Sequence, residues 1–147
     1  MVAEEAEFGT KVNLVELALV HPFFWGSNPI GSESVDPGRR ASVDWLWPFV
    51  CPSAPDSDDP RVNPVAEGAP SLVGLGCRRV LVCVAEKDVL KDRGWLYYEA
   101  LGRSRWMGVV EIKETESEDH AFHLNDLECE KAKDLIRSLA AFFNRLP

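Results

Sequence analysis

A carboxylate and an imidazole follow two apolar segments that are typical of β-strands. Asp88 comes shortly after the run V-L-V-C-V-A at 80–85, and His120 comes after the run G-V-V-E-I-K-E-T at 108–115. Neighbouring strands that end at one edge of a sheet would deliver both side chains to the same place. An acid and a base presented in this way are two members of the Ser-His-Asp triad of nucleophilic catalysis.

Each of these residues has a catalytic and a purely structural interpretation. Asp88 either accepts a hydrogen bond from the base histidine and stabilises its imidazolium, or caps the helix that follows it. His120 is suited to proton transfer because its ordinary pKa is about 6.5, but it is also a residue type found in turns without a catalytic role. No serine lies in a G-x-S-x-G pattern. The nearest approach, G-R-S at 102–104, has Trp106 in place of the last glycine and follows a predicted helix.

The remaining candidates for chemistry have simpler interpretations. His21 ends a strand beside Pro22 and is expected to serve packing unless it lines a pocket, and His123 is expected to be structural or solvent-facing. Asp92 is expected to pair with a nearby arginine or to place negative charge in the first turn of a helix. The acidic run 114–119 is most simply a solvated loop, although it is close enough to His120 to raise its pKa.

The composition predicts a folded domain and limits its partners. The 147 residues are enough for one domain, with 46% hydrophobic and 10% aromatic residues. A net charge of −8 argues against binding to nucleic acid or to an anionic membrane surface. The four cysteines form no C-x-x-C pair, so neither a metal site nor a disulfide framework is expected. With an acidic N-terminus and no apolar run of about 18 residues, the chain is expected to be a soluble, cytoplasmic protein.

The hydrophobic pattern predicts an α/β fold with three mostly parallel strands. The segment 13–20 and the segment 79–85 are apolar almost throughout, which is typical of strands covered on both faces. The segment 108–115 alternates at its end, as in a half-exposed strand near a sheet edge. Helices are predicted over 89–101 and 125–146. The chain is therefore expected to form a single, partial domain over 1–147.

The two predicted helices have recognisable ends and faces. Gly94 lies inside the first helix at a cost of about 1 kcal/mol relative to alanine, and Gly102 is expected to stop it. Asn125 or Asp126 is expected to cap the second helix. The expected apolar faces consist of Leu90, Trp95, Leu96, Tyr98 and Leu101 in the first helix, and of Leu127, Ala132, Leu135, Ile136, Leu139, Phe142 and Phe143 in the second.

A long proline-rich excursion separates the first two strands. The segment 21–71 holds nine of the ten prolines and is predicted to be irregular, with one short helix in the aromatic stretch 44–50. Excursions of this length in a compact domain are more often functional than accidental. Its aromatic residues line an acyl or aromatic-ligand pocket in one interpretation and form a core beneath the loop in the other. The pocket candidates are Phe23, Phe24 and Trp25, followed by Trp45, Trp47 and Phe49.

Four motifs in sequence order resemble those of a known family. They are H-P-F-F-W-G at 21–26, D-D-P-R-V-N-P at 58–64, V-A-E-K-D-V-L-K-D-R-G at 84–94 and E-D-H-A-F-H at 118–123. Together they resemble the plant carboxylesterases. These are α/β-hydrolases similar to hormone-sensitive lipase, and the group includes 2-hydroxyisoflavanone dehydratases and gibberellin receptors.

The resemblance implies the C-terminal half of an α/β-hydrolase fold. Asp88 resembles the acid of the family's triad and His120 its base, with a small-molecule ester as substrate and no cofactor or metal. Family members carry an H-G-G-type oxyanion loop and a G-x-S-x-G elbow further upstream, and the segment 1–7 resembles the end of the helix after that elbow. The chain is therefore expected to be a fragment that lacks the nucleophile and is inactive alone. Substrate identity, and hydrolase against dehydratase activity, stay open.

Two other functions are compatible with the same resemblance. The first is a small-molecule binding module like the gibberellin receptors, although these have lost the base histidine and need an N-terminal lid. The second is a non-catalytic truncated product, in which the segment 13–20 would form an unpaired apolar sheet edge that promotes aggregation.

Overall fold

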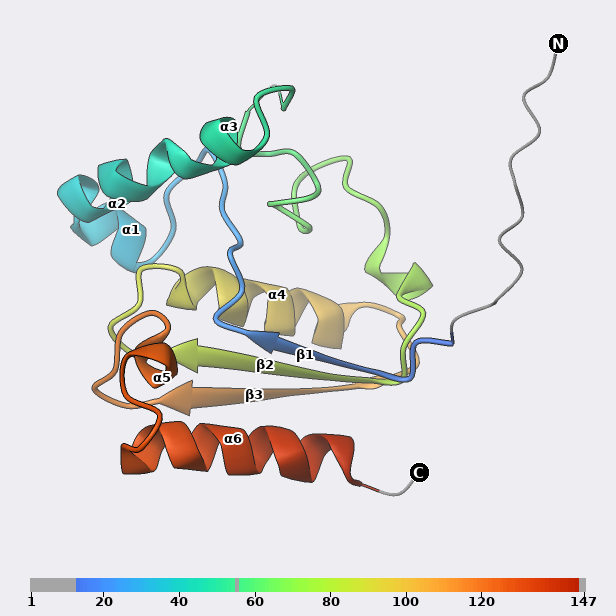
Figure 1. The fold of residues 1–147 in the computed structure, drawn as a ribbon. Helices are drawn as coiled ribbons and strands as arrows, with labels where there is room; N and C mark the ends of the chain where they lie inside the picture. Colours follow the sequence, from blue (N-terminus) through green and yellow to red (C-terminus); the bar gives the residue numbers. More distant parts are fainter. Residues whose placement is uncertain (1–12, 55, 146–147) are drawn as a thin grey trace, which may run out of the picture.

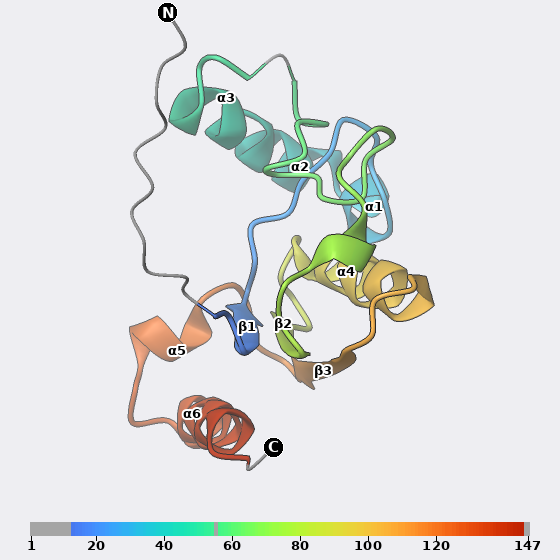
Figure 2. The same cartoon turned by 90° about the vertical axis from the view of Figure 1, so that its right-hand side faces the viewer.

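The computed structural model describes residues 13–54 and 56–145, which form a layered α/β structure. The strands β1 (Glu16–Val20), β2 (Arg79–Ala85) and β3 (Val109–Thr115) pair in parallel, in the order β1-β2-β3. Helix α4 (Lys91–Arg103) packs on one face of this sheet (Figure 1). Helices α5 (Phe122–Asn125) and α6 (Glu130–Phe143) lie on the opposite face (Figure 2). The predicted fold class is confirmed.

The central strand β2 has an uninterrupted apolar run, 80–85, because both of its faces are buried. Leu81, Cys83 and Ala85 pack toward α6, whereas the three valines that alternate with them pack toward α4. The strand β1 begins at Glu16 and is partly covered on both faces, as predicted for 13–20, because Leu17 and Leu19 pack toward α4 and Ala18 and Val20 toward α6. Its residues are nevertheless only half-buried. The reason is that β1 pairs only with β2 among the described residues. β3 is half-exposed at the other edge, as predicted.

Glycine inside α4 permits close packing of the helix on the sheet. A Cβ atom added at Gly94 would lie 2.5 Å from Val84 Cγ1, which is closer than real contacts allow. The helix buries Tyr97 and Leu101, while Tyr98 is only partly buried. The predicted stop at Gly102 is wrong, because α4 continues to Arg103.

We expect Gly94→Ala to destabilise the fold in spite of alanine's higher helix propensity. The added methyl group overpacks the contact with Val84, and overpacking of this kind costs about 1–3 kcal/mol. Gly102→Ala is the matched control in the same helix, since its Cβ would meet Val110 Cγ1 at an ordinary 3.8 Å. Urea unfolding should show a lower midpoint for the first variant and an equal or higher midpoint for the second. Equal midpoints for both variants would contradict the close packing.

The C-terminal helical region differs from its prediction at its start. Residues 122–125 form the separate short helix α5, and α6 begins only at Glu130. The predicted caps are wrong: the Cys129 Sγ accepts from the Ala132 amide at 3.4 Å, and Asp126 instead accepts from the Glu128 amide. Part of the predicted apolar stripe is about half exposed, namely Leu127, Ile136 and Phe143. No helix among the described residues is long and apolar enough to cross a membrane. The segment 1–7, compared above with a helix end, lies outside the described residues.

The excursion 21–71 is more helical than predicted. It contains α1 (Ser32–Val35), α2 (Pro37–Asp44) and α3 (Leu46–Val50), and the short 3-10 turn Leu72–Gly74 follows it. The short helix expected in 44–50 corresponds to α3. Helix α2 has the start signal that the prediction missed, because the Asp36 carboxylate caps the Arg39 amide at 2.9 Å and Pro37 occupies the first turn.

Buried ion pairs connect the helical segment formed by α1, α2 and α3 to helix α4. The Glu33 side chain is fully buried and contacts Arg93 at 2.7 and 2.9 Å and Arg40 at 2.5 Å. Both guanidinium groups lie over the ring of Trp25, at 4.9 Å for Arg40 and 5.7 Å for Arg93. Asp92 lies in the first turn of α4, as expected, and accepts from the Ser32 backbone and hydroxyl rather than from an arginine. The helical segment is thereby held over the carboxyl end of the sheet.

Candidate active site

Asp88 is held rigidly just beyond the end of β2. Its backbone amide donates to Ala85 O at 3.1 Å, and Oδ1 accepts from the Leu90 amide at 2.9 Å. The residue is 3% exposed. One carboxylate oxygen, Oδ1, therefore has the structural role considered for Asp88, because it caps the turn that leads into α4. The other oxygen, Oδ2, is left to face the next loop.

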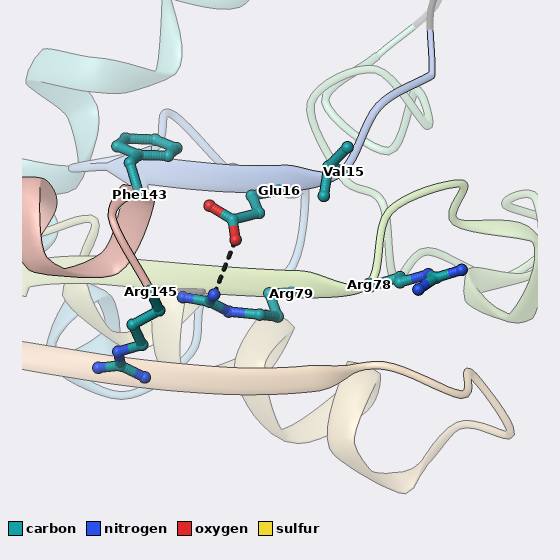
Figure 3. A pocket seen from close by; sticks show the side chains of 6 residues that line it. All are labelled: Val15, Glu16, Arg78, Arg79, Phe143 and Arg145. Carbon is teal, nitrogen blue, oxygen red and sulfur yellow. Dashed lines mark ion pairs between the residues drawn. The ribbon is translucent and has the colours of Figure 1, made fainter. Parts of the chain in front are cut away.

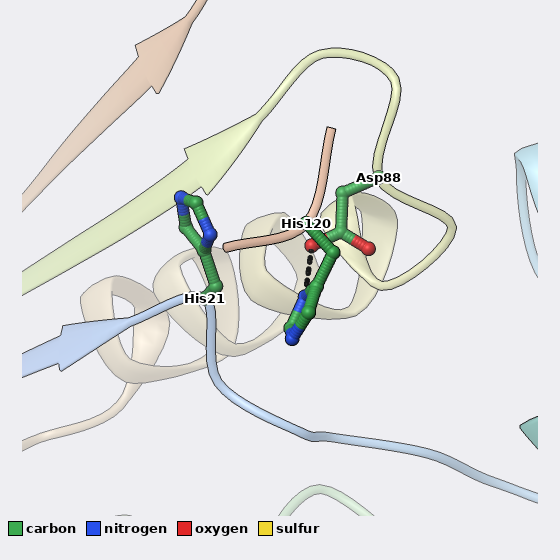
Figure 4. Close-up of side chains that lie close together, drawn as sticks. All are labelled: His21, Asp88 and His120. Atoms are coloured by element: carbon green, nitrogen blue, oxygen red, sulfur yellow. Dashed lines mark hydrogen bonds and ion pairs between the residues drawn. The ribbon is translucent and has the colours of Figure 1, made fainter. Parts of the chain in front are cut away.

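His120 meets this second oxygen from the loop after β3. Its Nδ1 lies 2.7 Å from Asp88 Oδ2, and the two residues are 32 positions apart in the chain (Figure 4). Nδ1–H donates to the carboxylate, so Nε2 is the nitrogen that can exchange a proton. The His120 side chain is 47% exposed, which leaves it accessible to a reacting group. The structure thus brings together the two residues selected from the sequence.

The electrostatic surroundings favour the charged form of His120. The hydrogen bond that His120 donates to Asp88 raises the pKa of His120 above its ordinary value of 6.5. Partial burial opposes this, and the charges of Asp88 and Asp119 raise the pKa further. The arrangement therefore stabilises an imidazolium, which is what the acid of a triad does after the base has taken a proton.

The acidic run 114–119 begins inside β3 and continues as a mostly exposed turn, and three of its carboxylates have partners. Glu114 accepts from the Trp95 indole at 2.7 Å, and Glu118 pairs with Lys131 at 3.1 Å. Asp119 accepts two bonds from Arg39, at 2.6 and 2.7 Å, which tie the loop to α2. The prediction that this run raises the pKa of His120 agrees with the contribution from Asp119.

Two further histidines lie beside the pair. The ring of His21 is 5.6 Å from that of His120 and 5.3 Å from that of His123, measured between centroids. His21 is 6% exposed, and its Nδ1 accepts from the Ala121 amide at 2.8 Å. The interpretation of His21 from the sequence, as a packing residue, did not include this hydrogen bond with the Ala121 amide. The available signal was the position of His21 at the carboxyl end of a strand that neighbours β2.

His21, Asp88 and His120 lie close enough together to be candidate metal ligands. One potential ligand atom from each lies within 4.8 Å of the others. However, the bond from Ala121 already uses one ring nitrogen of His21, and the bond to Asp88 uses one of His120. A metal ion bound through these nitrogens would displace both hydrogen bonds. The other ring nitrogen of each histidine, Nε2, is not engaged in these bonds, and the bonds that are present are those of an acid–base pair with a neighbouring support.

We expect His21 to make the fold sensitive to acid. Burial lowers the pKa of His21 to about 4, against 6.5 when exposed. The folded state therefore binds this proton less readily than the unfolded state, so stability is full above pH 6.5 and is lost as the pH falls from 6.5 to about 4. At about 1.4 kcal/mol per pKa unit the full loss is about 3 kcal/mol. Urea midpoints should fall more steeply over this range in the unmodified chain than in His21→Asn; parallel curves would contradict the prediction.

Of the predicted pocket aromatics, Trp25 is buried, Phe23, Phe24 and Trp47 are half-buried, and Trp45 and Phe49 are exposed. Trp25 is 0% exposed, and its indole donates to Asp44 at 2.9 Å. Phe23 stacks on Trp25 at 6.4 Å, and Phe24 packs on Tyr97 at 4.9 Å. Substrate binding by these residues stays a prediction. A cavity of about 410 Å³ beside Asp88 is lined by residues that include Ser32, Val35, Arg39, Glu86, Lys87 and Asp119.

A larger cavity lies away from the histidines, at the amino ends of β1 and β2. Its volume is about 660 Å³, and it is lined by Val15, Glu16, Arg78, Arg79, Phe143 and Arg145 (Figure 3). Arg79 is neutralised there by Glu16 at 2.7 Å. Since open α/β sheets bind ligands at the carboxyl ends of their strands, we assign the candidate site to the smaller cavity beside Asp88.

Comparisons with known proteins give the family. Residues 1–124 match the family model described as alpha/beta hydrolase fold. Probable carboxylesterase 2 of Arabidopsis thaliana is 51% identical over 130 residues, which are 88% of this chain and 41% of that protein. A 2-hydroxyisoflavanone dehydratase of Glycyrrhiza echinata is 48% identical over 122 residues, which are 82% of this chain and 37% of that protein. The chain thus spans about two fifths of the length of these relatives.

Solved structures agree on the fold. A hyperthermophilic esterase from Pyrobaculum calidifontis superimposes with a TM-score of 0.66 at 23% identity, over 86% of this chain and 42% of the esterase. This likeness supports the architecture alone. With the family match and the plant relatives, it confirms the resemblance predicted from the four motifs, and the chain belongs to the α/β-hydrolase fold family.

Proposed function

We propose that Asp88 and His120 are the acid and the base of a Ser-His-Asp triad in a carboxylic ester hydrolase. The observation that carries the proposal is the 2.7 Å contact between His120 Nδ1 and a buried Asp88 oxygen. Membership of the α/β-hydrolase family supports it, because that fold presents triad residues at the carboxyl ends of its strands.

In the proposed mechanism each group has a step. His120 Nε2 takes the proton of a serine hydroxyl as that oxygen attacks the ester carbonyl, and Asp88 stabilises the imidazolium that forms. The protonated Nε2 then gives its proton to the departing alkoxide, which leaves as the alcohol. Water, deprotonated by the same nitrogen, hydrolyses the acyl-enzyme. No cofactor takes part in these steps.

The nucleophile is proposed to come from outside these 147 residues. No serine of the chain lies in G-x-S-x-G. An acid–base pair without an attacking group forms no acyl intermediate, so the chain alone is expected to be inactive toward esters.

The proposed substrate is a small-molecule carboxylic ester that enters the cavity of about 410 Å³ beside Asp88. That volume lies within the usual range of ligand pockets. The net charge of −8 supports the absence of a nucleic-acid or anionic-membrane partner. All four cysteines are free, which fits a reducing compartment, and we propose the cytoplasm.

A chimera tests this function. In it the chain replaces the 130 residues that it matches in Arabidopsis thaliana probable carboxylesterase 2. The chimera is expected to hydrolyse p-nitrophenyl acetate, whereas the chain alone is expected to show only the background rate. A folded chimera that does not turn over the ester contradicts the hydrolase assignment. Turnover by the isolated chain that depends on His120 contradicts the proposed external nucleophile.

The intact mass of the native protein is an independent test of the source of the nucleophile. A mass near 16.4 kDa means that the nucleophile must come from another chain. A mass of about twice that value, with G-x-S-x-G in the additional sequence, places it in the same chain.

A further inference from the structure

The imidazole of His21 contacts the backbone immediately beside the proposed base. Its Nδ1 accepts from the amide of Ala121, the residue that follows His120, across 100 positions of sequence. The ring of His21 itself is turned away from the contact between Asp88 and His120 (Figure 4). We propose that His21 is a positioning residue, which fixes the turn that carries His120 so that its imidazole meets Asp88. This role rests on the proposed acid–base function of that pair.

The turn needs such a support because of its backbone conformation. Ala121 has φ 55° and ψ 25°, in the left-handed region that residues with a Cβ atom disfavour. Conformations of this kind persist only where the surroundings determine them. Among the described residues, the recorded acceptor for the Ala121 amide is the His21 ring. Releasing that amide would allow the backbone to leave the left-handed region and to move His120.

His21 is itself anchored to the rigid part of the fold. It directly follows β1, and its backbone amide donates to Cys83 O of the central strand at 2.9 Å. It also has a left-handed φ of 46°. The sheet therefore positions the His21 ring, the ring holds the Ala121 amide, and the amide orients the neighbouring His120. Asp88 is positioned independently through its bonds to Ala85 and Leu90.

The chemistry of the site explains why a histidine occupies this position. Because Nδ1 accepts a hydrogen bond, the neutral ring carries its proton on Nε2, and this atom is buried without a hydrogen-bond partner in the described structure. An unpaired buried polar atom lowers stability, and a phenylalanine would pack against Phe122, 5.6 Å away, without that cost. What a histidine adds is the acceptor for Ala121, together with a better tolerance of the positive φ at this position.

The acceptor is present at neutral pH. Burial lowers the pKa of His21 to about 4, and the facing groups are Asp88, His120 and His123. The ring is thus uncharged, and Nδ1 keeps its lone pair. An uncharged ring also adds no net charge beside His120, so a change in the pKa of His120 after substitution of His21 is not caused by the loss of a charge.

Two substitutions of His21 distinguish the effect of its hydrogen-bond acceptor, Nδ1, from the effect of its ring packing. His21→Phe keeps a ring of similar size but has no acceptor. His21→Asn places a carbonyl oxygen near the position of Nδ1, and asparagine tolerates a positive φ. Both are made in the 147-residue chain, together with Asp88→Asn. Two quantities are measured by NMR: the hydrogen-exchange protection of the Ala121 amide and the pKa of His120. Amide-shift dispersion reports whether each variant is folded.

In the unmodified chain we expect a protected Ala121 amide and a His120 pKa above 6.5. In His21→Phe the protection should be lost and the His120 pKa should fall toward 6.5, whereas His21→Asn should preserve both. A folded His21→Phe with both properties intact overturns the positioning role. So does a folded His21→Asn that loses them, which decides the question if the phenylalanine variant does not fold.

Failure of the underlying function gives a different result. If Asp88→Asn leaves the His120 pKa unchanged, the acid–base pair itself is absent. If Asp88→Asn lowers that pKa but the chimera does not hydrolyse the ester, the pair exists without the proposed hydrolysis, and the His21 comparison still reports how His120 is held.

Discussion

In the chimera described above, Asp88→Asn is expected to lower kcat for p-nitrophenyl acetate by about 10³–10⁴-fold. An asparagine side chain can place its amide N–H toward His120, so the ring no longer keeps its proton on Nδ1 and its lone pair on Nε2. The imidazolium formed during attack also loses its counter-charge. His120→Ala removes the proton acceptor itself and should have an effect at least as large.

The control and the pH profile make this result specific. Asp126→Asn changes an exposed carboxylate that accepts only from the nearby Glu128 amide, and it should leave kcat unchanged. Since His120 must be neutral to accept a proton, turnover should rise with pH through its raised pKa, above 6.5. A His120→Ala chimera with near-normal turnover would remove His120 from the mechanism.

Glu33→Ala is expected to destabilise the chain by about 3–5 kcal/mol, the cost of breaking a buried ion pair by removing one partner. The Glu33 carboxylate is fully buried and accepts from Arg93, from Arg40 and from the Ile30 amide. Its loss would leave the 5% exposed Arg93 and its neighbour Arg40 as two adjacent positive charges without a shared partner. Such a loss is a large part of the 5–15 kcal/mol that stabilises a typical domain.

Urea unfolding followed by tryptophan fluorescence measures this loss, because Trp25 lies buried beneath both guanidinium groups. Glu67→Ala, at an exposed turn position, is the matched control and should unfold near the original midpoint. Replacing Glu33, Arg40 and Arg93 together by apolar residues of similar size should cost less than Glu33→Ala, since no buried charge is then left unpaired. If Glu33→Ala unfolds at the midpoint of the control, the cluster does not hold the helical segment in place.

The helical segment matters for the site because it forms one wall of the cavity beside Asp88. Ser32, Val35 and Arg39 line that cavity, and Arg39 also holds the loop of His120 through Asp119. Loosening the Glu33 cluster is therefore expected to affect both stability and the shape of the proposed substrate site. The sequence pattern predicted that the excursion 21–71 is functional but also that it is irregular. The contribution of its helices to the cavity wall was therefore not predicted.

Several features followed from local sequence rules. A strand buried on both faces must be apolar, and β2 is apolar from Val80 to Ala85, where it is buried. Parallel strands end at one edge of a sheet, so Asp88 and His120 were expected to meet, and they do. The helix boundaries were less accurate, because α6 begins after a thiol cap at Cys129 that local propensity does not reveal.

By itself the sequence determined the fold class, the order of the strands along the chain and the pairing of Asp88 with His120, since each depends on a local pattern or on the general geometry of parallel sheets. Only the tertiary structure decided that His21 supports the turn after His120, 100 residues away, and that Glu33 binds Arg93, 60 residues away. The physical reason is that such contacts depend on the path of the chain between their partners. A buried histidine or glutamate in the sequence carries no sign of which distant group will satisfy it.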